Sequence, residues 1–145
     1  MTESELRDQL TTAMRAKDAV RVRAIRAVLS LVKNRRIEVR GEELAEREVA
    51  SLIQREVKQC RETLDFARKA GRADQVAEHE ELLAVLEGLL PTALGEDELR
   101  EAIRAAIAAT GATNLGPVMK VLGEQYAGRY DGKVASALAK ELLAG

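Results

Sequence analysis

The first 90 residues of this 145-residue chain contain no proline and only three glycines, Gly41, Gly71 and Gly88. Few residues that break helices therefore interrupt this part of the chain. The whole chain has 24 alanines and 19 leucines, whereas aromatic residues make up 2% of it. Helix formers at this density, with few of the β-branched and aromatic residues that fill sheets, predict an all-α fold. A β-sandwich, a β-barrel and a Rossmann sheet are excluded.

Apolar residues recur at helical spacing along this front part. Ser4 is expected to cap a first helix and Asp18 a second one. The longest periodic stretch, 44–70, should end at Gly71, and the helix that follows over 73–90 should return against it as an antiparallel hairpin. The positions expected to face inward are Leu6, Leu10, Met14, Val22, Ile25, Leu29, Val32, Val49, Leu52, Ile53, Val57, Cys60, Leu64, Ala67, Val76, Leu83, Leu86 and Leu90.

The helical pattern breaks at Leu90-Pro91, and we place a domain boundary there, between residues 1–91 and 92–145. Gly41 should end the second helix or begin the turn after it. The predicted architecture is an N-terminal long-helix hairpin domain followed by a small three-helix bundle. The helices of the bundle are expected over residues 96–109, 115–126 and 132–143.

The residue types that catalysis requires do not come together in this sequence. His79, the only histidine, lies between two glutamates on a polar stretch, which is typical of a solvated helix surface. Cys60 shares helical spacing with apolar neighbours, which is typical of a small buried side chain. No metal-binding spacing, phosphate-binding loop or nucleophile motif is present. We therefore expect no catalytic residues, no metal and no cofactor.

The sequence also predicts where the chain resides. A single cysteine excludes an internal disulfide, which favours a reducing compartment. No run approaches the roughly 20 apolar residues of a membrane span, and the first residues are acidic and polar, unlike a secretory signal. We expect a cytoplasmic protein with no membrane partner.

The net charge of −1 conceals a strong asymmetry along the chain. Residues 1–72 hold 17 Lys and Arg against 12 Asp and Glu, whereas residues 73–145 hold 6 against 12. Nine of the cations lie in residues 15–40, and a helix places three of them within an arc of roughly 80°. Such a cluster is typical of a surface that contacts phosphate backbones. The same arginines could instead pair with the acidic stretch 74–87, inside the protein or across a dimer. The three cations on the arc are Arg23, Arg26 and Lys33.

A second candidate surface lies near the C-terminus. Gly128 and Gly132 are turn residues that can expose backbone amides beside Arg129 and Lys133. A helix that begins after Gly132 would direct its positive end at this turn, where a phosphate could bind. A tight turn between two helices accounts for the same residues.

Three groups of short motifs lie along the chain: Ala13-Met14-Arg15-Ala16-Lys17-Asp18, then Leu90-Pro91 with Leu94, and finally Gly116-Pro117-Val118-Met119 followed by Gly128-Arg129-Tyr130-Asp131-Gly132-Lys133. In their order and spacing, these motifs resemble the YqeY family over essentially the whole chain. The C-terminal part is similar to the tail of the B subunit of tRNA-dependent glutamyl/aspartyl-tRNA amidotransferase. Two positions depart from the family pattern: Leu89 replaces an aromatic residue, and Pro117 replaces a lysine.

This resemblance implies a non-catalytic tRNA- or RNA-binding accessory module, associated with glutamine-dependent amidotransferase (carbon–nitrogen ligase) activity or another translation protein. An amidotransferase in its own right would need a glutaminase nucleophile and a nucleotide-binding loop, which the sequence does not offer. Few aromatic residues are available to stack on bases, so RNA would be recognised by shape and phosphate contacts. The alternative is a helical protein–protein adaptor with no nucleic-acid partner. The candidate RNA contacts are Arg23, Arg26, Lys33, Lys120, Gly128, Arg129, Gly132 and Lys133.

Overall fold

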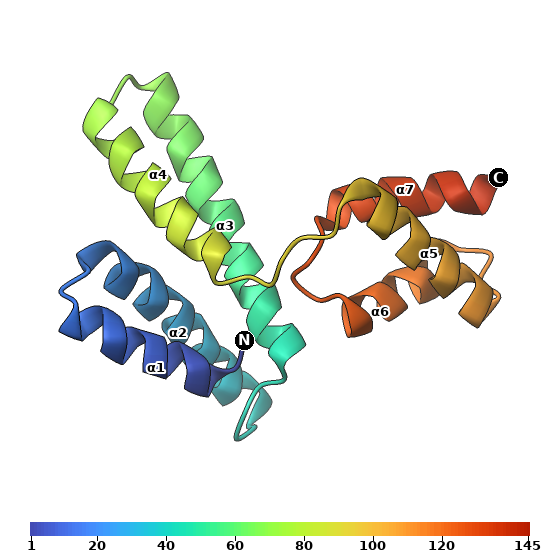
Figure 1. Ribbon diagram of the computed structural model, residues 1–145, viewed down its shortest axis with the longest axis horizontal. Coiled ribbons are helices and arrows are strands. Elements are labelled where there is room, and N and C mark those ends of the chain that lie inside the picture. Colours follow the sequence, from blue (N-terminus) through green and yellow to red (C-terminus); the bar gives the residue numbers. More distant parts are fainter. The chain divides into compact units, whose positions relative to one another are not determined.

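The computed structural model describes residues 1–145 and contains seven helices and no strand (Figure 1). The predicted all-α class is confirmed. The helices form two compact units, Met1–Leu90 and Pro91–Gly145. None of them combines the length and the apolar character that crossing a membrane requires.

Four helices build the first unit: α1 (Glu3–Arg15), α2 (Ala19–Val39), α3 (Glu46–Lys69) and α4 (Ala73–Gly88). In Figure 1, α1 and α2 form one antiparallel pair, and α3 and α4 form another. Helix α2 packs against each of the other three helices and is therefore the centre of this unit.

The starts of the first two helices are fixed by side-chain caps. The Asp18 carboxylate accepts a hydrogen bond from the backbone N–H of Arg21 at 3.1 Å, so the predicted cap of α2 is confirmed. The predicted cap of α1 is wrong: the Thr2 hydroxyl accepts the N–H of Glu5 at 3.1 Å, and Ser4 lies inside the first turn. Both residues carry a hydroxyl that can cap, and the helix begins at the earlier one.

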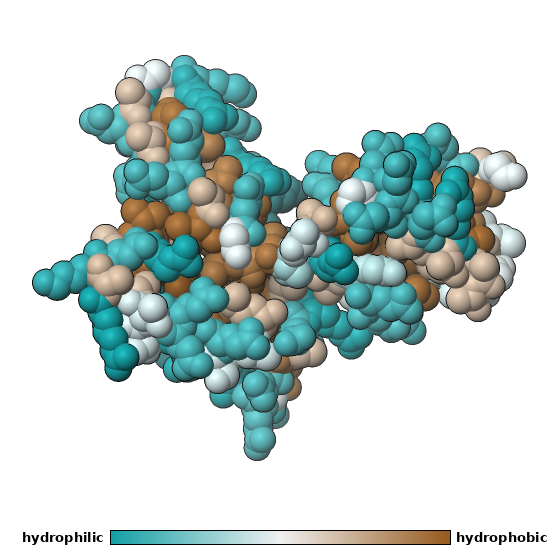
Figure 2. All heavy atoms as spheres, viewed as in Figure 1, coloured by the Kyte–Doolittle hydropathy of each residue, from teal (hydrophilic) through white to brown (hydrophobic).

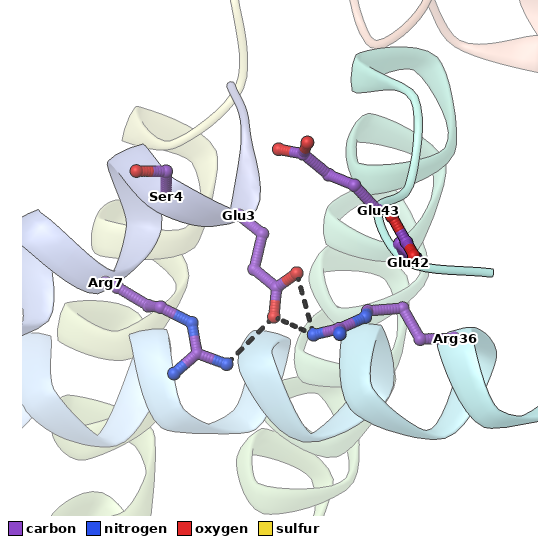
Figure 3. Close-up of a pocket in the computed structure, with 6 residues that line it drawn as sticks. All are labelled: Glu3, Ser4, Arg7, Arg36, Glu42 and Glu43. Atoms are coloured by element: carbon purple, nitrogen blue, oxygen red, sulfur yellow. Dashed lines mark hydrogen bonds and ion pairs between the residues drawn. The ribbon is translucent and has the colours of Figure 1, made fainter.

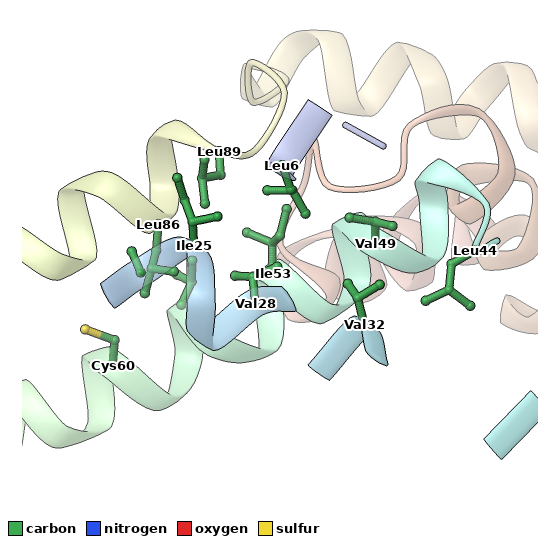
Figure 4. Close-up of a cluster of buried hydrophobic side chains, with 12 residues drawn as sticks. Leu6, Ile25, Val28, Val32, Leu44, Val49, Ile53, Cys60, Leu86 and Leu89 are labelled. Atoms are coloured by element: carbon green, nitrogen blue, oxygen red, sulfur yellow. The ribbon is translucent and has the colours of Figure 1, made fainter. Parts of the chain in front are cut away.

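The core of the first unit gathers apolar side chains from all four helices (Figure 4). Met14 was expected to face this core but is 51% exposed, and Ala13 is buried in its place. The reason is geometric, because seven residues from Leu6 return a helix almost to the same face, whereas eight rotate it by a further 100°. The core residues are Leu6, Ala24, Ile25, Val28, Val32, Leu44, Val49, Ile53, Val57, Cys60, Leu86 and Leu89.

The surface of the first unit is not uniformly polar. Figure 2 shows apolar side chains that reach the surface between α1 and α4, among a hydrophilic exterior. The leucines and valines that pack at the edge of the core are only partly buried and include Leu10, Leu82 and Val85.

The second unit is a bundle of three helices, α5 (Glu96–Thr110), α6 (Leu115–Gln125) and α7 (Gly132–Ala144), each of which packs against the other two. Gly111 caps the end of α5 and adopts a left-handed conformation with φ of +65°. The core of this unit comprises Leu99, Ala102, Ile103, Ala106, Val118, Leu122, Ala135, Leu138 and Ala139.

We expect opposite effects when alanine replaces Gly71 and Gly88. A Cβ at either position would meet nothing within 4 Å, so only the backbone differs. Gly71 has a φ of +67°, as predicted for the residue that stops α3, and Gly71→Ala should lower the free energy of unfolding by about 1–2 kcal/mol. Gly88 ends α4 with an ordinary φ, and Gly88→Ala should raise that free energy by up to about 0.5 kcal/mol. Urea denaturation followed by circular dichroism measures both, and two changes of the same sign would contradict the prediction.

Candidate functional site

The three cations predicted to share one arc of α2 lie on its exposed side, opposite the buried face. Arg26 and Lys33 are exposed and take part in no ion pair. No acidic residue of α2 falls within the arc from Arg23 to Lys33. The other exposed side chains along this face are Ala19, Ser30, Asn34 and Ile37. We call this surface the α2 cationic face.

The acidic stretch 74–87 reaches only one member of the α2 cationic face. Arg23 forms an ion pair with Glu78 of α4, and both side chains remain about half exposed. Exposed pairs of this kind contribute little to stability, of the order of 0–1 kcal/mol. Within one chain, the acidic hairpin therefore neutralises Arg23 and does not reach Arg26 or Lys33.

The turn between α6 and α7 is held by Arg129. Its backbone carbonyl accepts the N–H of Leu94 at 2.7 Å, and its Nε donates to the carbonyl of Thr92 at 2.9 Å. The guanidinium also lies 5.8 Å from the centre of the Tyr126 ring. The turn depends on Gly128, which is buried and has a φ of +78°. Arg129 is therefore engaged in the fold through its backbone, its Nε and its guanidinium face.

The N-terminus of α7 is capped by a carboxylate of the chain itself. The Asp131 carboxylate accepts the N–H groups of Lys133 at 2.8 Å and Val134 at 3.2 Å, and Gly132 is the first residue of the helix. A phosphate at this helix end would have to displace a carboxylate of the same charge sign. The Asp131 side chain thus occupies the position that a phosphate would take. Lys120 of α6 and Lys133 remain exposed without ion pairs.

A buried carboxylate that the sequence did not reveal connects α1 to the end of α2 (Figure 3). The Glu3 side chain is 8% exposed and accepts hydrogen bonds from Arg7 at 2.9 Å and from Arg36 at 2.9 and 3.2 Å. Burial raises the pKa of Glu3, but the hydrogen bonds and charges of the two arginines outweigh it and hold the pKa below its ordinary value. No sequence signal marks this contact, because 33 residues separate Glu3 from Arg36.

The Glu3 ion pairs lie at the edge of a polar hollow of roughly 400 Å³. Nothing in it forms a metal centre, because no group of three or more His, Cys, Asp or Glu in the chain is placed to hold an ion. The residues that line the hollow are Glu3, Ser4, Arg7, Arg36, Glu42 and Glu43.

Cys60 and His79 meet where α3 packs on α4. The Cys60 thiol lies 3.5 Å from the carbonyl oxygen of His79, and the His79 Nδ1 lies 2.8 Å from the carbonyl oxygen of Gln75. Cys60 is buried, as predicted, and burial raises the pKa of its thiol. A protonated, buried thiol is a poor nucleophile.

Comparison with known proteins identifies relatives of this chain. A family model described as "Yqey-like protein" matches residues 3–143. The chain is also 31% identical over 93 residues to altered inheritance of mitochondria protein 41, mitochondrial, of Lachancea thermotolerans. That match covers 62% of this chain and 50% of the relative, so it spans about half the length of the relative.

We expect the ion pairs of Glu3 to make stability depend on pH. Because the pKa of Glu3 is lower in the folded chain, its contribution is present above its ordinary pKa of 4.5 and is lost as the pH falls through the folded value. Glu3→Gln should therefore lower the free energy of unfolding at pH 7 by about 1–3 kcal/mol. It should also flatten the pH dependence below pH 4.5. Urea denaturation at a series of pH values measures this.

The matched control is Glu5→Gln, because Glu5 lies in the same first helical turn but its side chain is exposed and unpaired. It should change stability little at any pH. An effect of Glu5→Gln as large as that of Glu3→Gln would show that the helix dipole, rather than the ion pairs, causes the loss.

Proposed function

The chain belongs to the YqeY family, and on that premise we propose that it is an RNA-binding accessory module with no catalysis of its own. The α2 cationic face is the observation that carries this proposal. Arg26 and Lys33 project from one side of a helix, are exposed, and have no acidic neighbour on the arc. Cations presented in this way attract phosphate backbones and release counterions when they bind.

The expected mode of recognition is contact with phosphates rather than with bases. The α2 cationic face carries no aromatic side chain on which a base could stack. Tyr126 and Tyr130 of the second unit pack against its core. The resemblance of the second unit to the tail of the amidotransferase B subunit makes tRNA the first RNA to test.

The second unit would contribute less to RNA binding than the α2 cationic face. Lys120 and Lys133 are exposed without ion pairs and are available for phosphates. Arg129 has only its outer guanidinium nitrogens left for a ligand, because its Nε holds Thr92. Gly128 and Gly132 would act through the shape of the turn.

The test is a fluorescence anisotropy titration of labelled tRNA at several salt concentrations. The unmodified chain should bind at low salt and release the RNA as salt increases. The double variant Arg26→Ala with Lys33→Ala should bind more weakly. The logarithm of the binding constant decreases linearly with the logarithm of the salt concentration. The magnitude of this slope should be smaller in the variant by about 0.7–0.9 for each phosphate that the variant no longer neutralises.

A matched control removes two cations from another helix of the same unit. Arg55 and Lys58 of α3 are exposed and unpaired, so Arg55→Ala with Lys58→Ala changes the net charge equally. It should leave the slope almost unchanged. Absence of tRNA binding at low salt would overturn the proposed function, and equal effects of both double variants would overturn the assignment to α2.

The second candidate function is a helical protein–protein adaptor. The ion pair of Arg23 with Glu78 favours it, because the basic and acidic parts of the first unit partly neutralise each other. Ile37 and Phe66, which are 66% and 74% exposed, offer apolar contacts to a protein partner. An adaptor would not bind tRNA at low salt, so the same titration separates the two functions.

We also propose that any link to glutamine-dependent amide transfer is through a separate amidotransferase that shares the tRNA. The purified chain alone should then produce no amide from glutamine, and activity without a second protein would contradict this part of the proposal.

A further inference from the structure

The segment that joins the two units, residues 89–94, is anchored at its N-terminal end by the core of the first unit. Leu89 is 2% exposed and belongs to that core. Leu90 packs against the same core, and its N–H donates to the carbonyl of Glu87 at 3.1 Å. The first unit therefore fixes the chain up to Leu90.

At its C-terminal end the segment is anchored by the second unit. The Thr92 carbonyl accepts a hydrogen bond from Arg129 Nε at 2.9 Å. Leu94 donates its N–H to the Arg129 carbonyl at 2.7 Å and packs against the core of that unit. A single residue, Arg129, thus holds the segment at two points, and only Pro91 lies between the parts that the two units fix.

Pro91 itself restricts the remaining freedom. Its ring fixes its φ near −65°, and it keeps the preceding residue, Leu90, out of the helical region. Few soft torsions are therefore left between the two units. We propose that Pro91 is a one-residue pivot between the units, and that Arg129 is the latch that keeps the connection so short.

The latch has a measurable consequence. Without the Arg129 side chain, Thr92 loses its hydrogen bond, and residues 91–93 become a three-residue link up to the anchored Leu94. A longer link gives the two units more freedom to move relative to each other, so the spread of distances between them should increase.

The experiment measures the distribution of distances between one spin label on each unit of the full chain. Labels are attached at Glu81→Cys and Ala108→Cys, two exposed and unpaired positions, with Cys60→Ala to remove the native thiol. Pulsed electron resonance then gives the width of the distribution. Arg129→Ala should widen it relative to the chain that carries the same two labels and an intact Arg129.

The control is Lys133→Ala, which removes a cation from the same turn without touching the linking segment. It should leave the width unchanged. Helicity measured by circular dichroism shows whether Arg129→Ala is folded. An unchanged width in the folded Arg129→Ala variant, or equal widening by Lys133→Ala, overturns the latch.

A second variant tests the pivot without altering either unit. Pro91 is exposed and contributes to neither core, so Pro91→Gly should leave both units folded. It frees the φ of residue 91, and it should also widen the distribution. A width equal to that of the parent chain overturns the pivot.

Discussion

The burial of one face of α2 is the constraint on which the first unit depends. This helix packs against α1, α3 and α4, and its Ile25, Val28 and Val32 are fully buried. A helix that contributes so much to the core can carry its unpaired cations only on the remaining arc, because an unpaired buried cation would cost several kcal/mol. The position of Arg26 and Lys33 is thus a consequence of core packing. The same packing that stabilises the unit presents its charge outward.

The fold pairs four of the nine cations that the sequence concentrates in residues 15–40 with carboxylates. Arg36 binds Glu3, Arg23 binds Glu78, and Arg35 contacts carboxylates of α2 and α3. Most of these acids lie in helices other than α2, so those pairs exist only in the folded chain. Five of the nine cations in residues 15–40 take part in no ion pair, so fewer cations are available to a ligand than the sequence contains.

Much of the helical architecture could be predicted because its signals are local. The left-handed stop at Gly71 and the cap at Asp18 depend on one residue and its immediate neighbours. The cap of α1 was mispredicted because Thr2 and Ser4 both carry a hydroxyl that can cap a helix, and the sequence does not show which of them does so. The roles of Glu3 and Arg129 could not be predicted, because each depends on contacts with residues more than 30 positions away.

The single buried cysteine at the contact between α3 and α4 can report on local opening of the first unit. Cys60 is the only thiol, lies under α4, and faces a backbone carbonyl of that helix. A thiol reagent can reach it only in conformations where the packing around Cys60, which includes α4, has opened. The rate at which the Cys60 thiol is modified then measures how often this part of the first unit opens locally, separately from the unfolding of the rest of the chain.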